Sequence, residues 1–118
     1  MIDHSDILSA SQRYALGVEY DGSQFHGWQM QSGVSTVQES LERALGRVAS
    51  HPVRVITAGR TDTGVHASGQ VVHFDSHSDR PLNAWSRGTN TLTPPGLVVP
   101  WAIPVSAGFP ARFRVIGP

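Results

Sequence analysis

A ten-residue stretch, AGRTDTGVHA from Ala58 to Ala67, sets a carboxylate close to a guanidinium. Asp62 stands two positions after Arg60, and Gly59 and Gly64 lie on either side of the pair. An ionised carboxylate serves as a nucleophile or as a base, and a neighbouring guanidinium keeps its pKa low in a site sheltered from water. The glycines allow the backbone to bend tightly and to approach a ligand closely. The stretch is therefore the strongest candidate for a catalytic site.

Two other interpretations of this stretch are open. Asp62 can cap its own backbone in an ordinary turn between two strands, with Arg60 as an exposed neighbour. Asp62-Thr63-Gly64 is also the catalytic triplet of aspartic proteases, and Val115-Ile116-Gly117 resembles a segment found downstream in those enzymes. Arg60 and Thr61, however, stand where such proteases have apolar residues. An arginine beside the acid also favours its full ionisation, whereas the protease needs one proton shared between two aspartates.

The elements that precede the stretch are a strand and a helix. Residues 13–20 alternate between apolar and polar side chains, which is typical of a half-buried strand, and Asp21-Gly22-Ser23 predicts a turn after it. Thr36 and Glu39 have the spacing of a capping box and predict the start of a helix. An apolar stripe at helical spacing follows, made by Val37, Leu41, Ala44, Leu45 and Val48. His51-Pro52 predicts the end of that helix.

The elements around and after the stretch complete an α+β pattern. The sequence predicts strands over residues 53–57, 69–75 and 97–103, and a second helix that begins at Pro81 and includes Trp85. Pro100 favours an edge or bulge position for the last strand. The order β-α-β-β-α-β is that of the ferredoxin-like fold, an antiparallel sheet with both helices on one face. In this arrangement Asp62 lies at one end of the sheet, between two neighbouring strands.

Composition limits the classes of protein that need to be considered. The chain has 118 residues, of which 39% are hydrophobic and 15% charged, which is typical of a soluble globular domain. It contains no cysteine, and no apolar run is long enough to span a membrane. The first residues are acidic where a secretory signal is basic, so we expect a cytoplasmic protein, with residues 1–11 as a flexible tail. All nine basic residues are arginine and the net charge is zero, so RNA binding requires a local patch.

Four strings in the same order resemble the N-terminal half of the tRNA pseudouridine synthase A family. They are YALGVEYDGSQFHGWQMQ (residues 14–31), STVQESLERAL (35–45), AGRTDTGVHASGQVVHFD (58–75) and FPARF (109–113). The resemblance covers residues 13–113, and residues 12–118 are expected to form half of a pseudouridine synthase catalytic domain. The third string is the most specific of the four.

The resemblance implies an isomerase that converts uridine to pseudouridine in the tRNA anticodon arm, with no metal or organic cofactor. It implies that Asp62 is the catalytic residue and that Arg60 pairs with it and occupies the space of the extruded base. A further set of residues is expected to contact the RNA or the substrate, namely Gly59, Thr61, His66, Trp28 and Arg112. The family's habit of forming homodimers makes a second copy a plausible partner. His73 and His77 have a spacing that suits a metal on a helix, but they fall on a predicted strand, so no metal site is predicted.

The chain also departs from the family. Its members are about twice as long and have a catalytic cleft between two halves. Pro110 stands where a histidine is common and Thr63 where alanine is frequent. From these departures we expect the 118 residues to be an N-terminal fragment, a truncated frame or one partner of a split enzyme, with weak activity or none when alone. The alternative is a non-catalytic module that binds RNA or dimerises.

Overall fold

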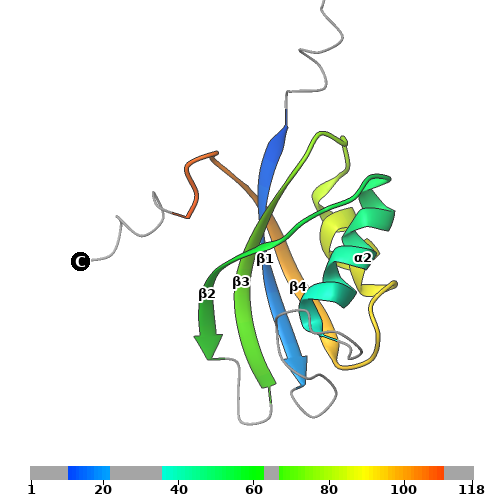
Figure 1. The fold of residues 1–118 in the computed structure, drawn as a ribbon, viewed down its shortest axis with the longest axis vertical. Helices are drawn as coiled ribbons and strands as arrows, with labels where there is room; N and C mark the ends of the chain where they lie inside the picture. Colours follow the sequence, from blue (N-terminus) through cyan, green and yellow to red (C-terminus); the bar gives the residue numbers. More distant parts are fainter. Residues whose placement is uncertain (1–10, 22–35, 63–66, 111–118) are drawn as a thin grey trace, which may run out of the picture.

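A four-stranded antiparallel sheet forms the centre of the molecule (Figure 1). The computed structural model describes residues 11–21, 36–62 and 67–110, and over residues 59–62 and 67–68 it describes the backbone alone. The elements are β1 (Gln12–Asp21), α2 (Val37–Ala49), β2 (Ile56–Asp62), β3 (Ala67–Ser76), η1 (Ala84–Gly88) and β4 (Leu97–Val105). The strands are arranged in the order β2-β3-β1-β4, and α2 and η1 cover one face (Figure 1). The predicted ferredoxin-like α+β fold is confirmed.

The helix α2 begins and ends where the sequence predicts. The hydroxyl of Thr36 accepts a hydrogen bond from the backbone N–H of Glu39 at 3.2 Å, which satisfies one free donor of the first turn. The Glu39 carboxylate lies 3.9 Å from Arg43, one turn further along. Ser50 ends the helix with a left-handed backbone (φ 63°) directly before His51. The apolar stripe of α2 packs into the core: four of its residues are buried and Val48 is partly buried.

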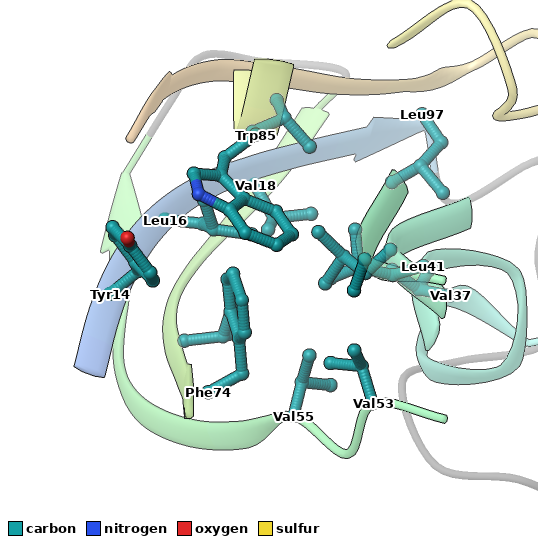
Figure 2. Packing of buried hydrophobic residues seen from close by; sticks show 14 residues of the cluster. Tyr14, Leu16, Val18, Val37, Leu41, Val53, Val55, Phe74, Trp85 and Leu97 are labelled. Carbon is teal, nitrogen blue, oxygen red and sulfur yellow. The ribbon is translucent and has the colours of Figure 1, made fainter. Parts of the chain in front are cut away.

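The second helix forms despite its poor helix-forming residues. It contains a π-helical turn, η1, and the side chain of Trp85 is fully buried beneath it. Trp85 packs against Tyr14 and Phe74, with ring centroids 5.3 and 5.0 Å away, and Tyr14 and Phe74 lie 5.5 Å from each other. Figure 2 shows this aromatic cluster beside the valines and leucines contributed by α2 and the strands. The tertiary contacts of one large side chain thus hold a helix that local propensity does not favour.

The boundaries of the second strand were predicted wrongly. The sequence placed it at residues 53–57, whereas β2 runs from Ile56 to Asp62. Val53 and Val55 are buried in the core, but they precede the strand, and the Val55 N–H donates to the Glu42 carboxylate at 2.9 Å. Pairing with β3 extends β2 to Asp62. Residues 58–62, which the sequence places after the second strand, are therefore part of that strand. Where a strand begins and ends is decided by its pairing with a partner strand rather than by β-propensity alone.

The strand β4 lies at an edge of the described sheet, as Pro100 predicts. Its pairing with β1 shifts register between Gly17 and Glu19, opposite the segment that contains Pro100. Pro100 therefore occupies both an edge strand and a bulge. No helix in the described part of the chain is long and apolar enough to cross a membrane.

The indole of Trp101 lies directly over Gly17 on the face of the sheet that the helices leave open. A Cβ atom placed on Gly17 would lie 2.3 Å from Nε1 of Trp101. We therefore expect Gly17→Ala to lower the free energy of unfolding by about 1–3 kcal/mol, because the indole must move off the strand. Urea unfolding of the variant checks this value. In a Trp101→Ala background the same change should cost less than about 0.5 kcal/mol, and an undiminished cost there would contradict the role of the indole.

Candidate active site

The predicted catalytic motif occupies the end of β2 and the connection to β3. The backbone of residues 59–62 pairs with residues 71–68 of β3, with Arg60 opposite Gln70 and Asp62 opposite Ser68. Asp62 is the last residue of β2, and Ala67 is the first residue of β3. The chain therefore reverses direction directly after the predicted catalytic acid, at one end of the sheet.

The register bears on whether Arg60 and Asp62 can act together. Positions two apart on a strand lie on the same face, so positions 60 and 62 share one face of β2. The register shift between Thr57 and Gly59 comes before these two positions, and the pairing with β3 is regular from Gly59 to Asp62. The backbone therefore permits the predicted pairing of acid and guanidinium.

The other predicted site residues fall into two groups. Gly59 and Thr61 lie on β2 beside Arg60 and Asp62, so four predicted site residues are brought together in one strand segment. Trp28, His66 and Arg112 lie outside the described residues. All of these functional roles stay predictions.

The histidines of β3 and its exit do not lie together. The side chain of His73 is buried within β3, whereas His77 stacks on His51 with ring centroids 4.5 Å apart. In the part of the chain that the structure describes, no group of three or more His, Asp or Glu residues could hold a metal ion.

A charged cluster that the sequence analysis missed lies at the opposite end of the sheet. The Arg13 guanidinium donates from Nε and Nη2 to the two carboxylate oxygens of Asp75, at 2.8 and 3.0 Å. This bidentate pair raises the pKa of Arg13, and it lowers the pKa of Asp75 below its ordinary value. Nη1 of Arg13 donates to the carbonyl oxygens of Ala107 and Phe109 at 2.9 and 2.7 Å. One signal was present in the sequence: antiparallel pairing of residues 13–20 with 69–75 sets Arg13 opposite Asp75.

His73 lies beside this cluster and is almost fully buried. The ring of Phe109 contacts it edge-on, with centroids 5.6 Å apart. Its Nδ1 atom is buried without a hydrogen-bond partner in the structure. Burial lowers the pKa of His73 below its ordinary value, and the positive charge of Arg13 lowers it further. Burial beneath Phe109 therefore favours the neutral form of His73.

The depressed pKa of His73 predicts how stability changes with pH. Because the unfolded chain keeps the ordinary pKa of 6.5, it binds more protons than the folded chain just below that pH. The free energy of unfolding should therefore rise as pH increases toward about 6.5 and then level off. Urea unfolding between about pH 5 and 7 measures this slope, and His73→Gln should reduce it. His77→Gln is the control, and an equal effect of the two changes would contradict the assignment to His73.

Comparison with known proteins identifies the family. A family model described as tRNA pseudouridine synthase matches residues 17–114. The tRNA pseudouridine synthase A of Dechloromonas aromatica is 59% identical over 105 residues, which is 89% of this chain and 40% of that protein. The protein of the same name from Pseudomonas aeruginosa is 60% identical, over 88% of this chain and 37% of that protein.

The chain thus spans about 40% of the length of the curated relatives that it matches. The family assignment and the helices packed on the sheet argue against the aspartic protease interpretation of Asp62-Thr63-Gly64, because retroviral-type proteases are all-β barrels. The motif that pointed to the family, residues 58–75, lies inside the matched range. The chain belongs to the tRNA pseudouridine synthase family.

Proposed function

We propose that residues 12–118 form the half of a tRNA pseudouridine synthase that carries the catalytic acid, with Asp62 in that role. The relatives that share 59% and 60% identity are named for this activity. The observation that carries the proposal is the backbone register at the end of β2, which sets Arg60 and Asp62 two positions apart on one strand beside a chain reversal.

The proposed reaction is an isomerisation of uridine within tRNA. The bond between N1 of the base and C1′ of the ribose breaks, and a bond between C5 and C1′ forms. The proton on C5 is lost and N1 gains one, so no atom is added overall. Asp62, ionised, serves as nucleophile at the sugar or as the group that stabilises and deprotonates the intermediate.

The neighbouring residues support this chemistry in the proposal. Arg60 keeps the carboxylate ionised and fills the space that the uridine leaves in the stack, which lowers the cost of extrusion. Gly59 permits close approach of the RNA backbone. The proposed RNA contacts outside this strand are His66, Trp28 and Arg112, with the anticodon arm as the target.

A partner that completes the site is also part of the proposal. Four large apolar side chains are 40–56% exposed on the face of the sheet that the helices leave open, namely Ile56, Val98, Trp101 and Ile103. Clusters of exposed apolar residues mark interaction surfaces. A second copy of the chain or a second polypeptide would cover them, in the cytoplasm where tRNA is modified.

Tritium release from tRNA that carries [5-³H]uridine tests the proposed function, because the isomerisation expels the hydrogen on C5. The chain is assayed alone and together with the remaining C-terminal portion of the Dechloromonas aromatica relative as a separate polypeptide. Release in either mixture, with pseudouridine mapped to the anticodon arm, supports the proposal. Binding of tRNA without release in both mixtures would favour the alternative, a non-catalytic RNA-binding module.

A further inference from the structure

We propose that the turn formed by residues 106–109 is a proton-sensitive lid: when the buried His73 takes up a proton, Phe109 lifts off the sheet and the imidazole becomes exposed to water. The lid lies on the face of the sheet that the helices leave open. The inference does not depend on the proposed function, because the opening is a property of the fold whether or not the chain acts on tRNA.

The side chain of His73 lies on the open face of the sheet, and Phe109 covers it there. Val72 and Phe74, its neighbours along β3, are buried in the core beneath the helices, so the residue between them projects to the other face. In the ladder with β2, His73 stands opposite Ile56, which is 56% exposed. The imidazole is only 4% exposed, and the Phe109 ring contacts it edge-on, with centroids 5.6 Å apart. Phe109 therefore shields His73 from solvent.

A protonated imidazole needs a hydrogen-bond acceptor at Nδ1. In the imidazolium form both ring nitrogens carry a hydrogen and both are donors. Nδ1 of His73 is buried, and it has no hydrogen-bond partner among the described residues. The side chains that stand opposite His73 in the two ladders, Ala15 and Ile56, carry no polar group. A buried donor without an acceptor is costly, and more so when it is charged, so a proton on His73 favours a conformation in which water reaches Nδ1.

The charged groups around His73 do not offset this cost. Arg13 contributes a positive charge from β1 and Asp75 a negative charge from β3, whereas β2 and the turn contribute the uncharged Ile56 and Phe109. Burial has the largest effect on the pKa of His73 and lowers it; Arg13 lowers it further, and Asp75 raises it. The closed turn thus disfavours the charged form. Exposure of the imidazole restores its ordinary pKa of 6.5.

The turn is the part of this enclosure that can move without breaking the sheet. Residues 106–109 belong to no strand, and the first three of them are exposed. Among the bonds that close the turn, the Phe109 N–H donates to the Ser106 carbonyl at 3.0 Å, and Arg13 donates to the Phe109 carbonyl at 2.7 Å. The strands on both sides of His73 are instead held by continuous ladders. Local opening therefore takes place at the turn rather than within the sheet.

Hydrogen exchange of the whole chain between about pH 4.5 and 7.5 tests the inference. The protection factor of the Phe109 amide measures how often the turn opens, because this N–H closes the turn, and it is corrected for the direct effect of pH on exchange. Amides in the ladder between β1 and β3 report opening of the sheet and serve as the internal reference. The measurement is made on wild type, on His73→Gln, and on His77→Gln as the matched control, which removes an exposed imidazole just after β3.

In wild type we expect the protection factor of the Phe109 amide to fall as pH drops below 6.5, by up to about tenfold for each unit of pH, because opening takes up one proton. The reference amides should stay better protected than the Phe109 amide over the whole range. His73→Gln should abolish the fall, since glutamine takes up no proton, and His77→Gln should leave it unchanged.

Three results would overturn the inference. A protection factor at Phe109 that does not change with pH in wild type would show that the turn stays closed whatever the charge of His73. A fall that the reference amides share equally would show that the sheet opens as a whole. A fall that persists in His73→Gln would assign the proton to another group. The first two results need wild type alone, and none of the three bears on tritium release, so the lid and the proposed function fail independently.

Discussion

Asp62→Asn is expected to reduce pseudouridine formation by about 10³-fold or more, in whichever mixture the wild-type chain is active. An amide carries no negative charge, so it neither attacks the sugar nor removes the proton from C5. The side chain keeps its size, and residue 62 is the last residue of β2. The free energy of unfolding should therefore change little. Tritium release and urea unfolding, measured on the same preparation, separate the two effects.

Matched controls decide whether the loss belongs to this carboxylate. Asp79→Asn removes an exposed carboxylate just beyond the far end of β3 and should leave tritium release unchanged. Arg60→Lys should also lower the rate, because a lysine keeps the charge but lacks the planar guanidinium. Wild-type conversion by Asp62→Asn would show that another group is the catalytic residue, whatever the sequence motif suggests.

The elements that the sequence predicted well are those whose signals are local. The helix α2 has a capping threonine, an apolar stripe at helical spacing and a proline just beyond its end, and its observed bounds, Val37–Ala49, follow from these features. Pro100 indicated an edge or bulge because proline lacks the N–H that a central strand must donate, and β4 has both properties. Each signal acts within a few residues of the position that it determines.

The elements that the sequence predicted poorly depend on distant contacts. Val53 and Val55 have the residue types of a strand, yet the ladder with β3 begins only at Ile56 and continues through Asp62. The start of β2 at Ile56 is determined by its register with β3. Local β-propensity does not indicate this register. The same holds for η1, where residues that favour turns are held helical by the burial of Trp85.

The same distinction between local and long-range signals applies to the residues of the candidate site and of the Arg13 cluster. Asp62 and Arg60 can be selected as candidate site residues from residues 58–67 alone, because the selection depends only on residue type and spacing. The contacts of Arg13 with residues 107 and 109 join positions more than 90 apart in sequence, and nothing near Arg13 indicates them. The Arg13–Asp75 pair can be predicted only when the register of β1 and β3 is known. The contact of Phe109 with His73 cannot be predicted from the sequence.

Trp85→Ala is expected to lower the free energy of unfolding by about 3–5 kcal/mol, which is a large part of the total stability of a domain of this size. The side chain is fully buried and is the largest in the core. Its removal leaves a cavity between Tyr14 and Phe74, and it releases a helix that has little propensity of its own. Urea unfolding monitored by circular dichroism measures the change.

Two further variants separate cavity formation from the polar atom of the indole. The Nε1 atom of Trp85 is buried without a hydrogen-bond partner in the structure, so Trp85→Phe removes an unpaired donor while keeping an aromatic ring. Its cost should therefore be much smaller than that of Trp85→Ala. Leu82→Ala, at a position that is 42% exposed on the same helix, should change stability by less than about 0.5 kcal/mol. If Trp85→Ala were no more destabilising than Leu82→Ala, burial of Trp85 would not be what holds η1 in place.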